Sequence, residues 1–390
     1  MINMSQSRLT PLLRFKGFTD AWEQCKFSLL ADVKRGLTYK PSDVASNGIR
    51  VLRSSNINED YFEKREDDVF VSQEAINIDY VKSGDILITS ANGSSRLVGK
   101  HAIINKIADN SAVHGGFMLL ARTNYSNFLN ASMSSRWYER FINLNVSGGN
   151  GAIGNLSKSN LDEYEFLAPS NNEKSKIGEF FQSIDSLITL HQRKYDKLVN
   201  VKKALLDKMF PQDGEVTPQL RFKGFTDAWE QREFGDILNT HPFKAFLANP
   251  SPDGEIEVIQ QGALPVIGYA NGEPFTNFDD IVLFGDHTVS IYKPRKPFFL
   301  ATDGVKIVSS NGINGDFLYY MFEKYKPTQQ GYTRHFLMLK EVHTSFPKNS
   351  KEMFMISLFL CKIDNLITLH HRKYEKLMNI KNSLLQKMFV

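Results

Sequence analysis

The chain has 390 residues, of which 42% are hydrophobic and 23% charged, and its formal net charge is +4. This length exceeds what one compact core usually serves, so we expect at least two folded domains rather than a disordered or collagen-like chain. Only two cysteines are present, Cys25 and Cys361, which excludes a disulfide framework and a cysteine-rich metal site and is typical of a cytoplasmic protein.

Neither a membrane span nor a signal peptide is expected. The longest strongly apolar run, residues 353–361, is about half of the roughly 20 residues that cross a bilayer. The first residues have no apolar core followed by a small-residue cleavage site.

Charge is distributed unevenly along the chain. Residues 25–170 carry 16 Lys or Arg and 16 Asp or Glu, and residues 232–348 carry 11 and 13. The positive surplus lies in residues 171–210, with 8 against 5, and in residues 349–390, with 7 against 3. The net charge of the two large regions therefore does not indicate which partner they bind.

A short segment near the N-terminus recurs in the middle of the chain. TPLLRFKGFTDAWEQ at residues 10–24 and TPQLRFKGFTDAWEQ at residues 217–231 are identical at 14 of 15 positions. A longer repeat follows each intervening insert: residues 184–210 and 363–389 are identical at 19 of 27 positions. The inserts themselves show no comparable match, so the chain consists of a repeated frame around two different inserts. Recent duplication alone would preserve the frame, but it does not explain why the inserts differ.

Each insert begins with short predicted strands and continues into a helix. Segments such as IRVLRSSNI in the first insert and DIVLFGDHTVSIY in the second alternate β-branched residues with turn residues, which is typical of strands. Apolar residues at helical spacing predict helices over residues 126–144 and 313–326. The predicted fold class is α/β (α+β), with two globular mixed domains that share a fold while differing in sequence.

The long repeat predicts a helix in each copy. Its apolar residues alternate four- and three-residue spacing, and it contains neither Gly nor Pro, so each helix is expected to extend about 40 Å. Pro211 and Gly214 supply a stop signal after the first helix. We expect the two helices to pack on each other, antiparallel and in a pseudo-twofold, circular arrangement; the alternative is that each lies on its own insert. The residues predicted to pair them are Ile184, Ile188, Tyr195, Leu198, Leu205, Ile363, Ile367, Tyr374, Leu377 and Leu384.

These patterns divide the chain into five segments. They are an N-terminal cassette (1–24), a first domain formed by insert one (25–170), a central helix with the second cassette (171–231), a second domain formed by insert two (232–348) and a C-terminal helix (349–390). The end of the second domain is the least certain boundary, because residues 347–364 are less regular than their counterpart. The cyclic order also predicts that Phe389 lies near Thr10.

No catalytic, metal or cofactor site is predicted. Gly149, Gly151 and Gly154 have dinucleotide-loop spacing but follow a predicted helix, so an ordinary loop is the preferred interpretation. Residues 93–101 resemble a phosphate loop with one residue too many and His101 in place of Ser or Thr. Zinc-ligand spacing, a nucleophile elbow and the adenine-methyltransferase signature are all missing from the sequence.

Polar, sparsely basic loops remain as candidates for contact with DNA, since Asn and Gln can pair with adenine, Arg with guanine and Lys with phosphate. Each of these residues could equally belong to an ordinary solvated loop. The candidates are Asn92, Arg96, Lys100, Asn150 and Lys158 in the first insert, and Lys293, Arg295, Lys296, Tyr332, Arg334 and His335 in the second.

The whole arrangement resembles the specificity subunit of a type I restriction-modification system. The residues that carry the resemblance are the duplicated LRFKGFTDAWEQ segments, GDILITSANGS at residues 84–94, and the duplicated helices beginning IDSLITLH and IDNLITLH. The resemblance implies two target-recognition domains, each reading one half of a split site in double-stranded DNA, with the helices as spacer.

The same resemblance implies that the frame docks two methyltransferase subunits and, through them, restriction subunits. Those partners would carry S-adenosylmethionine, ATP and magnesium, and this chain would be non-catalytic and cytoplasmic. The alternatives are a two-headed scaffold that binds protein or polysaccharide, and a self-sufficient methyltransferase or nuclease, which the missing motifs disfavour.

Overall fold

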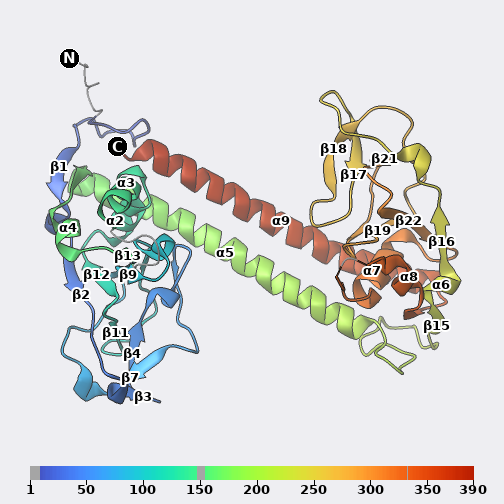
Figure 1. Ribbon diagram of the computed structural model, residues 1–390, viewed down its shortest axis with the longest axis horizontal. Helices are drawn as coiled ribbons and strands as arrows, with labels where there is room; N and C mark the ends of the chain where they lie inside the picture. Colours follow the sequence, from blue (N-terminus) through green and yellow to red (C-terminus); the bar gives the residue numbers. More distant parts are fainter. Residues whose placement is uncertain (1–8, 147–153, 332) are drawn as a thin grey trace. The chain divides into compact units, whose positions relative to one another are not determined.

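The chain divides into two compact units, Met1–Leu190 with Lys373–Val390, and His191–Arg372. The computed structural model describes residues 9–146, 154–331 and 333–390. We call residues 25–170 the first head and residues 232–348 the second head. The two cassettes and the two long helices together are called the frame. Figure 1 shows that each long helix takes part in both units.

The first head contains two four-stranded sheets. The inner sheet has the order β10-β8-β12-β2 and is antiparallel throughout, and the outer sheet has the order β11-β4-β7-β3, with β11 parallel to β4. The strands are β2 (Asp32–Arg35), β3 (Val44–Ala45), β4 (Ile49–Leu52), β7 (Val69–Val71), β8 (Ile86–Thr89), β10 (His101–Ile103), β11 (Ala112–His114) and β12 (Met118–Arg122).

Strand β8 shows why this head forms two layers. All four of its residues are buried. Ile86 and Ile88 pack with the helices on one face of the inner sheet, whereas Leu87 packs with the outer sheet on the other face. Successive side chains of a strand point to opposite faces, so an uninterrupted apolar run suits a strand covered on both sides.

The second head repeats this topology with one strand fewer. Its inner sheet has the order β16-β22-β19-β20, and its outer sheet has the order β18-β17-β21, with β17 parallel to β21. The strands are β16 (Leu238–His241), β17 (Ile256–Ile259), β18 (Val266–Ala270), β19 (Val282–Gly285), β20 (Ile291–Tyr292), β21 (Phe298–Leu300) and β22 (Val305–Ser310). The predicted mixed α/β heads with a shared fold are therefore confirmed.

Short elements join each head to the frame. Each inner sheet is preceded by a strand and a one-turn helix, and each head ends with a short helix and a strand that pairs back. In the first head these are β1 (Glu23–Lys26), α1 (Phe27–Leu30), α4 (Lys158–Glu163) and β14 (Glu165–Ala168); in the second they are β15 (Glu230–Glu233), α6 (Phe234–Ile237), α8 (His335–Lys340) and β23 (His343–Phe346). The first head also has the pair β5 (Ile57–Asn58) and β6 (Tyr61–Phe62).

The helix predicted over residues 126–144 is in fact two helices, α2 (Ser126–Met133) and α3 (Arg136–Asn145). The helix is interrupted at Ser135. The backbone of this residue is extended, and its hydroxyl donates to the carbonyl of Ser132. Serine side chains compete with the helix for backbone groups in this way. The prediction over residues 313–326 is confirmed by α7 (Gly315–Tyr325), which Asn314 caps by accepting from Phe317 N–H at 2.8 Å.

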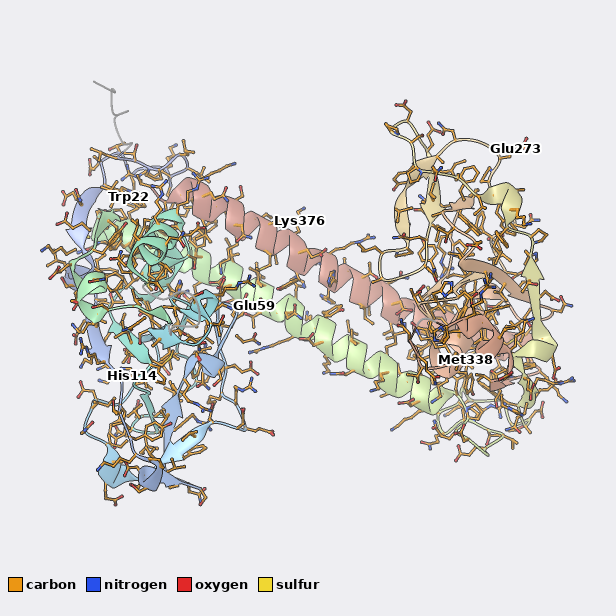
Figure 2. The ribbon with its side chains drawn as sticks, viewed as in Figure 1. Trp22, Glu59, His114, Glu273, Met338 and Lys376 are labelled. Atoms are coloured by element: carbon orange, nitrogen blue, oxygen red, sulfur yellow. The ribbon has the colours of Figure 1, made fainter. Side chains whose placement is uncertain are left out.

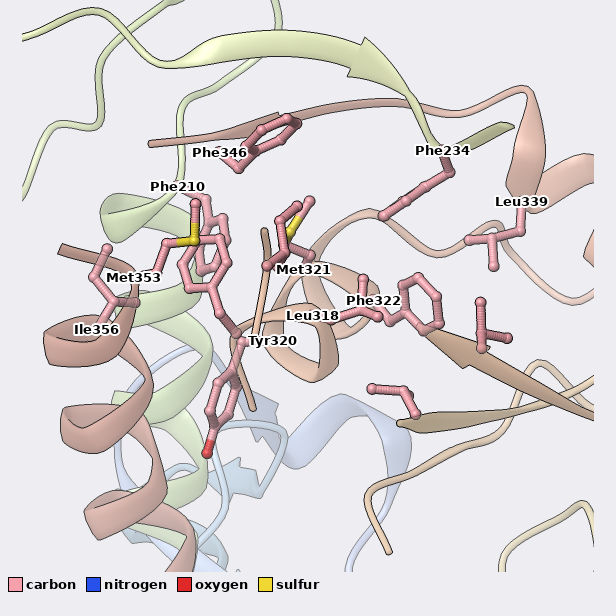
Figure 3. Close-up of a cluster of buried hydrophobic side chains, with 14 of the residues drawn as sticks. Phe210, Phe234, Leu318, Tyr320, Met321, Phe322, Leu339, Phe346, Met353 and Ile356 are labelled. Atoms are coloured by element: carbon pink, nitrogen blue, oxygen red, sulfur yellow. The ribbon is translucent and has the colours of Figure 1, made fainter. Parts of the chain in front are cut away.

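The long helices α5 (Asn171–Met209) and α9 (Ser350–Met388) each have 39 residues. At about 1.5 Å per residue each is about 58 Å long, which exceeds the predicted 40 Å because both begin well before the sequence repeat. The added turns pack against the heads: Met353, Ile356 and Leu360 of α9 share a core with α7, including Tyr320 and Met321 (Figure 3).

The two helices run antiparallel and contact each other in both units. In the first unit Lys381 pairs with Asp185 at 2.9 Å, and in the second Lys202 pairs with Asp364 at 2.7 Å. In the second unit the Nδ1 atoms of His191 and His370 also lie 2.8 Å apart. The two histidines, like the two lysines and the two aspartates, occupy equivalent positions of the repeat.

By length and composition alone α9 could cross a membrane, since an 18-residue window of it has a mean hydropathy of 1.4 and is 22% buried. Sequence analysis considered only the shorter apolar run 353–361 and therefore did not predict that α9 passes this test. A single such helix is weak evidence for a membrane span, and α9 makes the same frame contacts as its repeat partner α5.

Each cassette packs on the C-terminal end of a long helix. Leu13 N–H donates to Lys387 C=O at 2.9 Å in the first unit, and Leu220 N–H donates to Lys208 C=O at 2.8 Å in the second. A cavity of about 230 Å³ is lined by both Thr10 and Phe389. The described ends of the chain are therefore close together, as the cyclic order predicts.

Burial changes the protonation of one histidine in the first head, His114. His114 is 1% exposed, its Nε2 lies 3.2 Å from the carbonyl oxygen of Lys34, and burial lowers the pKa of its imidazole to about 4 (Figure 2). The unfolded chain takes up this proton near pH 6.5, whereas the folded chain does so only near pH 4. The folded state therefore loses stability as the pH falls from about 6.5 to about 4.

His114→Gln keeps a donor for the Lys34 carbonyl but cannot take up a proton. We expect this variant to lose about 3 kcal/mol less of its free energy of unfolding than the original chain when the pH falls from about 6.5 to about 4. Urea unfolding of the first unit at about pH 7 and about pH 4.5 measures it. His343→Gln, which replaces a histidine whose side chain is 78% exposed, is the control and should leave the pH dependence unchanged. An equally steep pH dependence in the His114 variant would contradict the assignment.

Candidate nucleic-acid interface

In each head the structure joins two loops that are far apart in the sequence. In the first head the short strands β9 (Ala91–Asn92) and β13 (Gly154–Asn155) pair, and Leu156 N–H donates to Ser90 C=O at 2.7 Å. In the second head His335 N–H donates to Asp286 C=O at 2.8 Å. Ser90 and Asp286 both follow the central strand of the inner sheet, so the two heads present loop pairs built in the same way.

The loop pair of the first head borders a cavity of about 610 Å³. Predicted residue Asn92 lies in its wall, where Nδ2 donates to Ser54 Oγ at 3.1 Å and Oδ1 accepts from Ser94 N–H at 2.9 Å. Both contacts fix the loop, so Asn92 positions its neighbours. The cavity is lined by Leu37, Thr38, Tyr39, Arg53, Ser54, Ala91, Asn92, Gly93, Gly115, Gly116, Phe117 and Met118.

The other predicted residues of the first head are dispersed. Arg96 is exposed and forms no ion pair with a described residue. Lys100 is partly buried and lines a different cavity, of about 510 Å³, beside α9. Lys158 is ion-paired with Asp162 within α4. Asn150 lies outside the described residues, as do Gly149 and Gly151.

In the second head two predicted residues are buried and serve the fold. Lys293 is 9% exposed, and its Nζ donates to the carbonyls of Phe278, Asp279 and Pro294 at 2.8 to 3.3 Å. Burial lowers the pKa of this ammonium group. Its charge is therefore not offered to DNA in this conformation, because three backbone acceptors already hold it.

His335 is fully buried beneath its loop. Its Nε2 accepts from Gln330 N–H at 2.9 Å, so Nδ1 carries the proton and donates to Asp286 C=O at 3.1 Å. The imidazole thus shapes the loop that precedes α8 and does not reach the surface. The sequence could not distinguish this role, because His335 follows an exposed arginine in a polar segment.

The remaining predicted residues of the second head are exposed or lie outside the description. Arg295 pairs with Asp316 at 2.6 Å and Lys296 pairs with Glu257 at 3.0 Å, while Arg334 is exposed just before α8. Tyr332 lies outside the described residues. Only the exposed cations of this group can meet phosphate without rearrangement of the fold.

The frame holds each head by equivalent aromatic contacts. Phe389 packs against Trp22 and Phe128 in the first unit, with ring centroids 6.1 and 5.9 Å apart. In the second unit Phe210 packs in the same way. Its partners are Trp229 at 5.7 Å and Phe317 at 5.5 Å. Trp22 and Trp229 are equivalent residues of the cassettes, and Phe128 and Phe317 are each the third residue of a head helix.

Comparison with known proteins supports this description. Residues 20–200 match the family described as type I restriction modification DNA specificity domain. These residues, which include the first head, are therefore similar to a type I restriction-modification DNA specificity domain. The crystal structure of the S subunit of a type I restriction-modification system from M. genitalium is 16% identical, with a TM-score of 0.68 over 98% of this chain and 99% of that chain. The fold of the chain is therefore that of an S subunit.

Two further solved structures were found with lower scores. A structure that addresses complex assembly and conformational transition of the type I R-M system is 13% identical, with a TM-score of 0.46 over 94% of this chain and 97% of that chain. The HsdS subunit from Thermoanaerobacter tengcongensis is 14% identical, with a TM-score of 0.34 over 94% of this chain and 96% of that chain.

In the first head, sequence analysis overlooked two residues that line the cavity of about 610 Å³. Arg53 follows strand β4, and Phe117, which is 68% exposed, lies in the turn between β11 and β12. The sequence VLR at residues 51–53 does place Arg53 directly after a predicted strand. The turn around Phe117 was not, because its neighbours Gly115 and Gly116 come close to Gly36 and Thr38 only in the fold.

The predicted helix-pairing residues are all buried or partly buried. Ile184 and Ile188 of α5 are buried in the first unit. The other eight are partly buried: Tyr195, Leu198, Leu205, Ile363, Ile367, Tyr374, Leu377 and Leu384. The repeat spacing also placed Lys202 and Lys381 in this seam, where each lysine pairs with an aspartate of the other helix.

Each seam lysine also reaches an acidic residue supplied by a head. Lys381 Nζ lies 3.6 Å from Asp60 of the first head as well as 2.9 Å from Asp185. Lys202 Nζ lies 2.6 Å from Glu323 of the second head. Burial raises the pKa of Asp185, and Lys381 opposes that rise. Each lysine therefore links the two helices and one head.

We expect Lys381→Met to destabilise the first unit by about 1–3 kcal/mol, because Asp185 loses its partner while partly buried and Asp60 loses its tie to the frame. Denaturant unfolding of the full chain measures the change. Lys376→Met, which replaces an exposed lysine of α9 (Figure 2), should alter stability by less than about 0.5 kcal/mol. Equal effects of the two substitutions would contradict the link.

Proposed function

We propose that this chain is the DNA specificity subunit of a type I restriction-modification complex, in which each head reads one half of a bipartite duplex site and the frame docks two methyltransferase subunits. One observation carries the proposal: both units repeat the same frame contacts and strand order, while the side chains of their loops differ. Equivalent surfaces suit identical partners, and unlike loops suit unlike base sequences.

Apolar residues on the long helices support two equivalent docking surfaces. At three positions of the repeat, both helices expose an apolar side chain to between 37 and 46%. These pairs are Leu187 with Leu366, Leu190 with Leu369, and Val201 with Ile380. Exposed apolar side chains on paired helices are typical of protein contact surfaces. Their repetition favours two copies of one partner over two different partners.

The heads are suited to sequence reading rather than to strong electrostatic attraction. Their charges nearly balance, with 16 positive and 16 negative side chains in residues 25–170 and 11 and 13 in residues 232–348. Because phosphate neutralisation supplies much of the affinity for DNA, a neutral reader needs positive surface from its partners. We therefore expect the isolated chain to bind duplex DNA weakly and the complex to bind it tightly.

The proposal assigns no catalytic role to this chain. Methyl transfer and cleavage would belong to the methyltransferase and restriction subunits, which would bind S-adenosylmethionine, ATP and magnesium, in the cytoplasm. What supports this division is the resemblance to S subunits and the lack of catalytic motifs in the sequence.

Reconstitution of the full chain with its methyltransferase subunits tests the proposal. Methylated adenines mapped in cellular DNA should define two half-sites at a fixed spacing. A duplex with that site should bind the complex at least about 1,000-fold more tightly than a scrambled duplex. A complex without sequence preference would contradict DNA specificity. Methylation by the chain alone with S-adenosylmethionine would contradict the non-catalytic role.

A further inference from the structure

Arg53 differs from the other partly buried arginines of the first head in its contacts. Arg50 and Arg122 each form an ion pair, with Asp68 and Asp85 respectively. Arg53 has no carboxylate partner among the described residues; its Nη2 donates to the carbonyl of Asp67 at 3.2 Å. Its Nε is buried and has no hydrogen-bond partner. A desolvated guanidinium nitrogen without an acceptor is unfavourable, so this group is ready for an acceptor from outside the chain.

The surroundings of Arg53 are a binding cavity rather than an open surface. The cavity measures about 610 Å³, which is within the roughly 300–1,000 Å³ of typical ligand sites. Arg53 is the one charged residue among the described residues that line it. The remaining lining is aromatic, aliphatic, small or uncharged polar. A single planar donor among neutral walls favours a flat acceptor edge over a phosphate, which exposed lysines and arginines bind more readily.

The rim of this cavity is rigid. Phe117 C=O accepts from both Ser90 N–H at 2.9 Å and Ala91 N–H at 3.1 Å, which ties the turn before β12 to the loop after β8. Gly36 approaches so closely that a Cβ there would lie 1.9 Å from the carbonyl oxygen of Gly115. The backbone of Phe117 is therefore held in place, and the residue is 68% exposed. An exposed aromatic ring on a fixed backbone, beside a guanidinium whose Nε has no acceptor, suits contact with a base.

The second head has a different residue at this position, and that residue lines a much smaller cavity. The parallel strand pairs β4–β11 and β17–β21 correspond, so Gln260, which follows β17, is the counterpart of Arg53. Gln260 N–H and its side chain donate to Pro265 C=O and Leu264 C=O, and the cavity there measures about 10 Å³. The unsatisfied arginine is thus a feature of the first head and not of the shared fold.

We propose that this cavity is the base-reading site of the first head, that Arg53 recognises a guanine of one half-site, and that Phe117 contacts the adjacent base. The inference rests on the proposed function and adds the residues and the base. Guanine presents two acceptors, O6 and N7, in the major groove, and arginine donates to both. Asn92 acts as a positioning residue, because it holds Ser54 next to Arg53.

The test uses the full chain in complex with its methyltransferase subunits and maps adenine methylation in a host that lacks other adenine methylation. With Arg53→Gln, discrimination at one G·C pair of one half-site should fall by about 5- to 150-fold, and the other half-site should stay unchanged. Arg53→Lys keeps the charge but loses the paired donors, so it should relax the same position. Phe117→Ala, which removes an exposed ring, should weaken preference at a neighbouring position of that half-site.

Two matched variants separate base reading from loss of charge or of folding. Arg65→Gln removes an exposed, ion-paired arginine of the same head and should leave the recognised sequence unchanged. Gln260→Ala in the second head should leave the guanine-containing half-site unchanged. Size-exclusion chromatography shows that each variant chain still assembles.

The outcomes distinguish this inference from the proposed function. An assembled Arg53→Gln or Arg53→Lys complex that methylates the same sequence as the original, with the same discrimination at every position, would overturn the assignment of Arg53. If the unsubstituted complex itself methylated without sequence preference, the proposed function would fail instead.

Discussion

Replacing residues 25–170 with the corresponding insert of an unrelated specificity subunit is expected to change one half of the recognised sequence and leave the other half intact. The first head has its own core clusters, and its loop pair is built within the head. Because the reading loops belong to the head, replacing the head should also replace the DNA sequence that it recognises. Mapping methylated adenines in cells that express each chimera measures the result, and an unaltered recognition sequence would refute it.

The structure sets two conditions for a functional graft. The new head needs an aromatic or large apolar residue where Phe128 meets Phe389. It also needs an acidic residue where Asp60 meets Lys381. A chimera that lacks the acid should assemble less well than one that has it. Restoring the acid in the same chimera is the control, because it changes one residue and leaves the reading loops as they are.

Arg14→Met is expected to destabilise the first unit by about 3–5 kcal/mol, which is among the largest effects available to a single substitution. Arg14 donates two hydrogen bonds to Glu173, each 2.7 Å long, and the Glu173 side chain is 0% exposed. Removing the arginine leaves a buried carboxylate without its counter-ion. Arg221 and Glu352 form the same pair at 2.7 and 2.9 Å, so Arg221→Met should destabilise the second unit similarly.

Denaturant unfolding followed by tryptophan fluorescence measures these changes, since Trp22 and Trp229 report on the two cassettes. The double variant Arg14→Met with Glu173→Leu should recover most of the loss, because it removes the unpaired charge together with its partner. Arg65→Met, at a pair whose side chains are 45 and 67% exposed, should cost less than about 1 kcal/mol. A similar loss from Arg14→Met and Arg65→Met would show that the buried pair does not anchor the cassette.

The frame was largely predictable because its segments occur twice in the sequence. Two copies of LRFKGF and two helical seams can be compared position by position, and their equivalence implies equivalent contacts. The ion pair between Arg14 and Glu173 was not predicted, and the repeat spacing placed Lys381 in the helix seam without indicating its partners Asp185 and Asp60. Charged residues in an amphipathic pattern are ordinarily assigned to the solvated face, and only the fold shows that these are buried.

The candidate site was less predictable because it depends on tertiary contacts. Polar loop residues were identified from composition alone. Composition does not distinguish an exposed residue such as Arg96 from the buried Lys293 and His335, whose side chains hydrogen-bond to backbone carbonyls. Arg53 was overlooked because its distinction is the lack of a carboxylate partner, a property of three-dimensional neighbours. The helix break at Ser135 was overlooked for a related reason, since helical apolar spacing continues through it.

Because His191 and His370 contact each other, these two equivalent residues of the repeat cannot both carry their protons on the same atoms. Their Nδ1 atoms lie 2.8 Å apart, so a hydrogen bond between them needs one nitrogen to donate and the other to accept. Two residues with the same position in the repeat must then differ in tautomer at any instant. One neutral ring then carries its proton on Nδ1 and the other on Nε2, so two matching helices are chemically distinct where they meet. To exchange these roles, each ring would have to lose one proton and gain another at its opposite nitrogen, without any heavy atom moving.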